Sequence, residues 1–299
     1  MLDTSMISFL APAFFASLIL TGIHAYLGVH VVERGVIFVD LSLAQIAALG
    51  ATIAILLPVS GGDPHAGVVY WISLAFTFIG AFVFSTIRGQ KARIPQEAII
   101  GICYAVASAA AILAMSKATS ESEHLKDMLV GNILAVSWPE VAKTAVLYAV
   151  IGAFHFTFRR QFLAISMDHG RHHREPPSHG LSVRFWDFLF YASFGFVVTS
   201  SVSIAGVLLV FCYLIVPSVA AMLYADSIGK RLEIGWSMGT IVSALGVYLS
   251  LRLDLPTGAT IVVTFGLVLI IVALVRPLIQ RSPAHDVHQV NYTDRAHGH

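Results

Sequence analysis

The chain alternates between long apolar segments and short polar connections. A helix needs roughly 20 apolar residues to cross the hydrocarbon core of a bilayer. Segments of about that length or longer lie at 8–32, 36–57, 68–87, 98–115, 141–158, 188–225, 234–251 and 259–275. Helices are expected because lipid leaves the backbone groups of an open strand unsatisfied. The pattern therefore predicts an all-α, polytopic integral membrane helix bundle.

The segment 188–225 decides the number of spans. It contains 38 residues and no charged side chain, which is too long for one ordinary crossing. Two crossings that turn near Ser200–Gly206 give nine spans in total. One crossing followed by a helix broken near Pro217 gives eight. The sequence thus predicts eight or nine transmembrane helices.

The composition supports a membrane protein and excludes other classes. Hydrophobic residues make up 57% of the chain and charged residues only 12%, whereas soluble domains carry about 25% charged residues. This balance argues against a soluble enzyme or a disordered protein. The formal net charge of +1 indicates no polyanionic partner, so no nucleic acid is expected. Cys103 and Cys212 both lie in apolar segments and are interpreted as small core residues.

The distribution of lysine and arginine predicts the orientation, because basic residues concentrate in cytoplasmic connections. Of the 18 basic residues, 14 fall in one alternating set of connections: Arg34, Arg88, Lys91, Arg93, Arg159, Arg160, Arg171, Arg174, Arg184, Lys230, Arg231, Arg276, Arg281 and Arg295. This places the C-terminus inside and the N-terminus outside, and it favours two crossings in 188–225. We therefore expect a transmembrane domain over 1–275, a cytoplasmic loop over 159–187 and a disordered, histidine-containing cytoplasmic tail over 276–299.

A few polar side chains lie within the apolar segments. Asp40 is the only carboxylate there, Gln45 shares its segment, and His24 and His30 lie in the first segment. Ionisable groups within a membrane are functional candidates by default. Carboxylates and imidazoles are ligands for zinc, manganese and ferrous iron. These four residues are therefore the predicted metal-binding residues of a site between the first two spans.

Other interpretations of these side chains stay open. Asp40 also suits a structural role as the partner of Arg34, and His30 suits a polar cluster at the membrane boundary. Asp40 and Gln45 are five residues apart, roughly 140° around a helix, so they do not share a face. His155, near the end of its segment, is expected at the interface.

Histidines also cluster in the predicted cytoplasmic regions. Four lie in the loop and four in the tail: His169, His172, His173, His179, His285, His288, His297 and His299. Histidine-rich tracts can hold metal ions loosely, which slightly favours zinc over manganese and iron. The sequence lacks the phosphate-binding loop G-x-x-x-x-G-K-[ST], so the chain is not expected to hydrolyse nucleotides by that route. It also lacks the H-E-x-x-H motif of helical metalloproteases.

Five segments in the same order resemble one known family, the permease subunits of metal-ion ABC importers (ABC-3), which serve zinc, manganese and iron. The most specific match is Ile204–Leu223 (IAGVLLVFCYLIVPSVAAML), which contains Pro217. The other four are Gly28–Gly50, Ile94–Ala105, Leu129–Ser137 and the segment Asp254–Val262 before the last span. The resemblance covers nearly the whole chain.

The resemblance implies a set of partners and roles. It implies a homodimer of permeases in a prokaryotic inner membrane, a cytoplasmic ABC ATPase subunit and an extracytoplasmic metal-binding protein. It also implies a coupling helix after the fifth span, formed here by Phe162, Leu163, Ile165 and Asp168. The family's metal path presents Asp and His four residues apart. In this sequence Gln45 stands at the histidine position, and Asp40 lies one residue before the aspartate position.

The sequence therefore predicts the permease subunit of an ABC importer that moves a divalent metal ion, zinc ahead of manganese or iron, into the cytoplasm. No tightly bound cofactor is expected. The alternative is a proton-coupled secondary transporter in which Asp40 and His24 form a proton relay. A membrane enzyme or an assembly scaffold is least favoured, because no nucleophile–base pair is evident.

Overall fold

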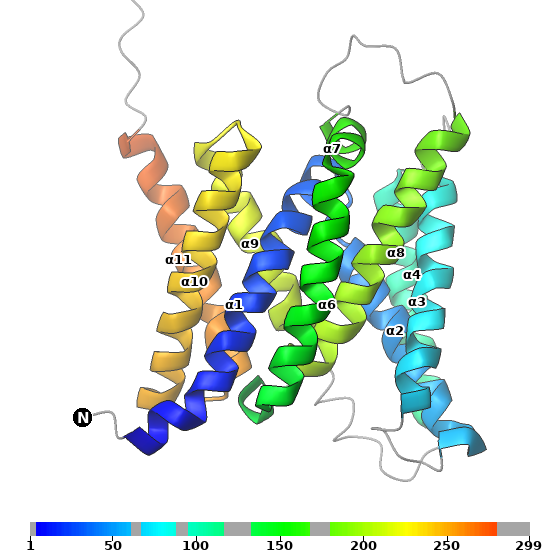
Figure 1. Cartoon of the computed structure of the whole chain (residues 1–299), viewed down its shortest axis with the longest axis horizontal. Coiled ribbons are helices and arrows are strands. Elements are labelled where there is room, and N and C mark those ends of the chain that lie inside the picture. Colours follow the sequence, from blue (N-terminus) through cyan, green and yellow to red (C-terminus); the bar gives the residue numbers. More distant parts are fainter. Residues whose placement is uncertain (1–3, 61–66, 88–94, 117–132, 168–179, 280–299) are drawn as a thin grey trace, which may run out of the picture.

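The computed structural model describes residues 4–60, 67–87, 95–116, 133–167 and 180–279. Within these ranges the regular structure is entirely helical (Figure 1). The helices are α1 (Thr4–Glu33), α2 (Val39–Leu56), α3 (Gly67–Ile87), α4 (Gln96–Met115), α6 (Trp138–Thr157), α7 (Arg159–Met167), α8 (Gly180–Ala205), α9 (Val207–Tyr224), α10 (Ile228–Leu253) and α11 (Thr257–Ile279). Short 3-10 turns lie at Pro58–Ser60 and Ile133–Ala135.

The number of spans agrees with the sequence. Eight of the described helices are long and apolar enough to cross a membrane, and α6 together with α7, bent by 74° between them, makes a ninth. The all-α polytopic bundle is therefore confirmed. The bend leaves α7 lying across the end of α6, at the edge of the bundle (Figure 1).

The long apolar segment 188–225 is divided between two helices. They meet at Gly206, whose φ of 76° and ψ of 162° suit glycine and few other residues. In Figure 1, α8 runs toward one edge of the bundle and α9 returns from it. Pro217 lies inside α9 without ending it, so the interpretation with a break at Pro217 is wrong.

The bundle is organised around α1, which packs against α9, α10 and α6, while α2 packs against α3 and α4 and α3 against α8. The approach of α1 to α9 is the tightest, because a β-carbon on Gly28 would overlap the carbonyl group of Leu214. The Ser218 hydroxyl donates to that same carbonyl at 2.8 Å and to the Ala25 carbonyl at 3.3 Å. The Gly28 position thus sets how close the two helices lie.

Helix α1 runs from one edge of the bundle to the other. The C-terminal end of α1 lies at the same edge as α7, and the N-terminal end of α1 lies at the opposite edge (Figure 1). The predicted loop 159–187 is helical at both ends, where α7 and the start of α8 lie. Helix α11 continues to Ile279, four residues beyond the predicted end of the transmembrane domain, and residues 280–299 of the tail lie outside the described residues.

We predict that Gly206→Ala destabilises the protein by about 1–3 kcal/mol, because the backbone there has a conformation largely restricted to glycine. Thermal unfolding in detergent measures the change. Gly266→Ala is the matched control: Gly266 lies inside α11, where an added β-carbon meets no atom within 4 Å, so this variant keeps or raises the melting temperature. Equal melting temperatures for wild type and Gly206→Ala would contradict the role given to Gly206.

Candidate functional site

Asp40 is buried without a protein partner. It lies in the first turn of α2, is 1% exposed, and neither carboxylate oxygen accepts a hydrogen bond from any described residue. The partial positive charge of a helix N-terminus favours a carboxylate at this position. A buried charge without a partner is nevertheless costly, so Asp40 is an unsatisfied group that a cation would satisfy.

Other oxygen atoms of α2 share this property. The hydroxyls of Ser42 and Thr52 are buried and find no hydrogen-bond partner in the described part of the chain. Gln45 is 8% exposed and adds an amide oxygen about one helical turn after Ser42. Helix α2 therefore carries hard oxygen donors at several depths, although Asp40 and Gln45 do not share a helical face.

His24 is a second buried side chain with an atom available to bind a metal ion. Its ring is fully buried in α1, and Nδ1 lies 2.8 Å from the carbonyl oxygen of Leu20. A carbonyl only accepts, so Nδ1 carries the proton and Nε2 holds the lone pair of the neutral ring. Nε2 contacts no donor among the described residues. His24 is thus buried with a free lone pair, beside the ring of Tyr148 at 6.2 Å.

The described residues bring no three His, Cys, Asp or Glu side chains close enough to hold a metal ion together. Asp40, His24 and His30 therefore belong to no site with three such ligands within that part of the chain. Isolated metal ligands spaced along a path suit an ion that must bind weakly enough to leave again. The ligand roles of Asp40, Gln45, His24 and His30 stay predictions.

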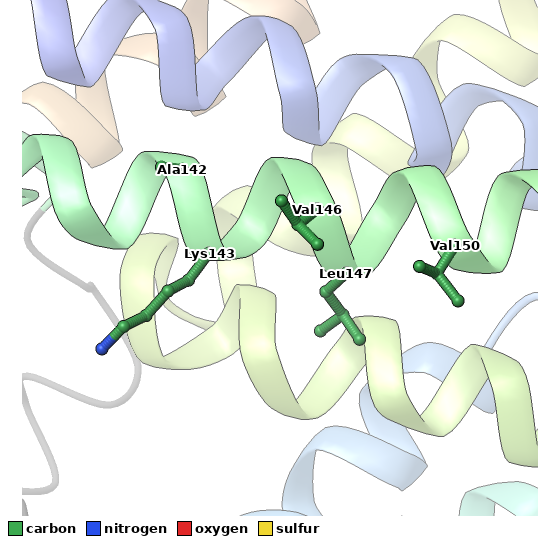
Figure 2. Close-up of a pocket in the computed structure, with 5 residues that line it drawn as sticks. All are labelled: Ala142, Lys143, Val146, Leu147 and Val150. Carbon is green, nitrogen blue, oxygen red and sulfur yellow. The ribbon is translucent and has the colours of Figure 1, made fainter.

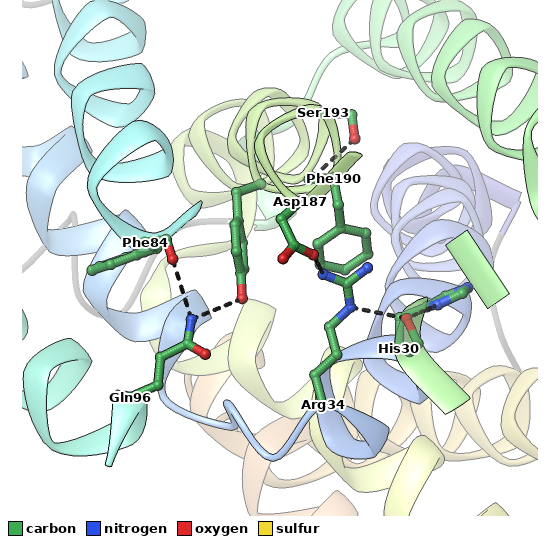
Figure 3. A network of polar contacts seen from close by, with 9 residues as sticks. His30, Arg34, Phe84, Gln96, Asp187, Phe190 and Ser193 are labelled. Carbon is green, nitrogen blue, oxygen red and sulfur yellow. Dashed lines mark hydrogen bonds and ion pairs between the residues drawn. The ribbon is translucent and has the colours of Figure 1, made fainter. Parts of the chain in front are cut away.

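His30 belongs to a polar network at the end of α1 (Figure 3). Its Nδ1 lies 2.8 Å from Ser166 Oγ, and Arg34 Nε donates to the same hydroxyl at 2.9 Å. Arg34 Nη1 forms a 2.8 Å ion pair with Asp187 Oδ1, and both side chains are buried. The guanidinium lies 3.8 Å from the centre of the Phe190 ring, a favourable cation–π geometry.

This network corrects one interpretation of the sequence. Arg34 pairs with Asp187 of α8, so the structural role considered for Asp40, as the partner of Arg34, is wrong. His155 lies in the last turn of α6, near the end of its segment as expected, and its side chain is only 1% exposed. Its Nε2 lies 2.8 Å from Ser193 Oγ, and its ring stacks on Phe162 at 4.4 Å.

Helix α7, the predicted coupling helix, has a buried and an exposed side. Phe162 and Ile165 are buried, at 0% and 8% exposure, and face the bundle. Leu163 is half-buried, and Asp168 lies outside the described residues. The exposed residues are Arg159, Arg160, Gln161 and Ala164. Phe162 and Ile165 therefore hold α7 against the bundle, and the opposite side is open to a partner.

The two remaining predicted positions lie in different surroundings. Pro217 is buried in α9, on the side that faces α10 near Gly235. Asp254 is exposed and ends α10 with a left-handed φ of 54°, and its backbone N–H donates to the Ser250 carbonyl. Asp254 thus shapes the turn between α10 and α11.

A groove of about 560 Å³ lies along α6 (Figure 2). Its lining is apolar apart from one lysine: Ala142, Lys143, Val146, Leu147 and Val150. The ammonium group of Lys143 repels cations, and the other side chains offer no ligand. The groove is therefore unsuited to a metal ion.

Asp187 and Ser166 were not found by reasoning from the sequence. Asp187 directly precedes the uncharged segment, so it was counted with the polar loop. A signal was present, because Asp187 shares a helical face with Phe190, Tyr191 and Phe194, all fully buried. A charge on such a face needs a buried partner of opposite sign.

Known proteins resemble the chain over nearly its full length. Residues 6–276 match the family described as the ABC 3 transport family. The manganese transport system membrane protein MntC of Listeria monocytogenes is 24% identical over 270 residues, which cover 90% of this chain and 91% of the relative. The chelated iron transport system membrane protein YfeC of Yersinia pestis is 25% identical over 288 residues, 96% of this chain and 91% of the relative.

A solved structure has the same fold. The structure described as PsaBC from Streptococcus pneumoniae in complex with Fab superposes with a TM-score of 0.69 at 23% identity. The superposition covers 88% of this chain and 90% of that chain.

We predict that Asp187→Ala costs about 3–5 kcal/mol of stability, because it leaves the charge of Arg34 buried without its carboxylate. The double variant Arg34→Met, Asp187→Leu removes both charges and keeps apolar volume, so its loss is smaller. Thermal unfolding in detergent compares the two. A double variant less stable than Asp187→Ala would contradict the ion-pair account.

Proposed function

The chain belongs to the ABC 3 transport family, as its five sequence segments predicted, and from this membership we propose that it is the permease subunit of an ABC importer for a divalent transition-metal ion. Relatives of similar length carry the names of manganese and chelated iron transport system membrane proteins. The eight long apolar helices of the described residues, nine if α6 and α7 together form one span, suit the membrane-spanning role. The sequence lacks a phosphate-binding loop, so ATP hydrolysis belongs to a separate cytoplasmic subunit.

One observation carries the proposed ion path: the buried carboxylate of Asp40 has no hydrogen-bond partner among the described residues. A protein gains nothing in stability from such a group, whereas a passing cation gains a ligand. The hydroxyls of Ser42 and Thr52 and the amide of Gln45 extend the supply of oxygen atoms along α2. His24 adds a free imidazole nitrogen on α1.

The chemistry of these donors favours manganese or iron ahead of zinc. Carboxylate, amide and hydroxyl oxygens are hard ligands that suit Mn²⁺, whereas zinc favours nitrogen and sulfur. The relatives' names point the same way. The histidine tracts that favoured zinc lie in 168–179 and 280–299, outside the described residues.

The remaining partners follow from the importer role. An extracytoplasmic binding protein delivers the ion at the edge where α1 begins, and the ATPase binds at the edge that carries α7. A second copy of the permease completes the channel, and the assembly lies in a prokaryotic inner membrane. Closure of the ATPase moves α7, and the helices attached to α7 open the path alternately to either side.

We predict that Asp40→Asn lowers metal uptake by more than about ten-fold. Mutating a residue that only hydrogen-bonds to a metal ligand already lowers metal affinity about 10–100-fold, and Asp40 is proposed to bind the ion directly. The melting temperature stays equal or rises, since a buried amide costs less than a buried charge. Uptake of radioactive manganese into proteoliposomes with the ATPase measures the loss. Glu140→Gln is the matched control, because the exposed carboxylate of Glu140 accepts hydrogen bonds from the Ser137 backbone and hydroxyl at 2.8 and 2.7 Å.

Uptake by Asp40→Asn at the wild-type rate would overturn the proposed path. The same vesicles test the energy source: uptake should require ATP and persist after an ionophore collapses the proton gradient. Loss of uptake on adding the ionophore would instead indicate the secondary transporter.

We also predict that Gln45→His shifts the preference from manganese toward zinc, because it replaces an oxygen donor by an imidazole nitrogen. Competition between the two ions in the same uptake assay measures the shift. An unchanged ratio of zinc to manganese would show that Gln45 does not line the path.

A further inference from the structure

Helix α7 meets the bundle through a mainly apolar surface. Phe162 stacks on His155 of α6 and lies edge-on to Trp186 of α8 at 5.7 Å between ring centres. Ile165 completes this buried side. Apolar contacts are non-directional, so they hold α7 close to the bundle without fixing its rotation or its sliding.

Ser166 gives the contact a direction. It is fully buried on the same side of α7, and its hydroxyl accepts from Arg34 Nε at 2.9 Å. Its distance to His30 Nδ1 is 2.8 Å, so the hydroxyl hydrogen is placed to be donated to that nitrogen. His30 belongs to α1, and Arg34 directly follows the last residue of α1, with its backbone N–H donating to the His30 carbonyl at 3.0 Å. One serine thus joins α7 to two successive turns at the end of α1.

Arg34 extends the connection to a third helix. The guanidinium binds Ser166 through Nε. It also binds Asp187 of α8 through Nη1 and lies over the Phe190 ring, as Figure 3 shows. A guanidinium is planar and its donors have a fixed arrangement. The three contacts therefore fix α1, α7 and α8 relative to one another, which a flexible ammonium group would not do.

The end of α1 is also attached on its other side. Glu33, the residue before Arg34, forms an ion pair with Arg231 of α10, and Arg231 Nε donates to the Ala225 carbonyl at 2.8 Å. The end of α1 is thus a firm point against which α7 and α8 are held.

We propose that Arg34 and Ser166 are positioning residues for energy coupling: they lock α7 to α1 and α8, so that a displacement of α7 moves these helices as one body. This inference rests on the proposed importer function. Without these contacts of Arg34 and Ser166, a force on α7 rotates or slides that helix over the apolar contacts around Phe162 and does not move α1 and α8. ATP is then hydrolysed without transport.

The test compares metal ions taken up with ATP molecules hydrolysed, in proteoliposomes that hold the complete permease–ATPase complex. Ser166→Ala removes the hydroxyl and leaves the Arg34–Asp187 pair in place. We expect it to lower the ratio of uptake to hydrolysis by about five-fold or more, the lower range of typical coupling energies, while hydrolysis continues. Arg34→Lys keeps the positive charge and loses the planar set of N–H donors, so it lowers the ratio of uptake to hydrolysis further.

Ser85→Ala is the matched control. Ser85 is buried in α3, and its hydroxyl donates to the Phe82 carbonyl of its own helix at 2.7 Å. We expect this variant to keep the wild-type ratio. A wild-type ratio in both Ser166→Ala and Arg34→Lys would overturn the inference and leave the importer function intact. A wild-type complex without metal uptake would instead contradict the proposed function.

A second measurement reports how firmly α7 is held and does not depend on transport. Hydrogen exchange of the purified protein in detergent should speed up in residues 159–167 of Ser166→Ala and stay unchanged in Ser85→Ala. Equal exchange in α7 of wild type and Ser166→Ala would contradict the lock.

Discussion

The cost of burying charge in an apolar bundle explains where this protein places its few polar groups. Arg34 and Asp187 are both buried and form an ion pair at 2.8 Å, and the guanidinium also contacts Ser166 and the Phe190 ring. Asp40 is equally buried and has no such partner among the described residues. The first arrangement holds helices together, whereas the second is unfavourable unless a cation binds there. The cost of burying charge thus explains both the ion pair that stabilises the bundle and the unpaired carboxylate proposed to bind the ion.

The two sites lie on one continuous stretch of chain. Helix α1 ends at Glu33, Arg34 follows, and α2 begins five residues later with Asp40 in its first turn. The residue that binds α7 and the carboxylate proposed for the ion are therefore six positions apart. A displacement that α7 passes to Arg34 has a short route to the start of α2. The proposed coupling residue Arg34 and the proposed ion ligand Asp40 are thus joined by one short connection.

Much of the fold follows from the sequence, because spans are set by a local property. The length of each apolar segment gave the helices and the expectation of eight or nine spans, and the bias of lysine and arginine predicts their orientation. Asp40 was found because it is the only carboxylate in those segments. Partners were harder to find: Ser166 and Asp187 meet Arg34 across 132 and 153 residues of chain. Such pairs depend on how the helices pack, and the periodicity of a single sequence does not contain that information. The burial of His155 was hidden for the same reason, since its ring stacks on Phe162 of α7, a helix that bends away from α6 by 74°.

The most direct measurement of the central claim is an anomalous-diffraction map of the protein crystallised with manganese. We predict a manganese peak at the Asp40 carboxylate, between α2 and the neighbouring helices, and its loss in crystals of Asp40→Asn. A peak only at other residues, with Asp40 bound to a protein donor, would contradict the account.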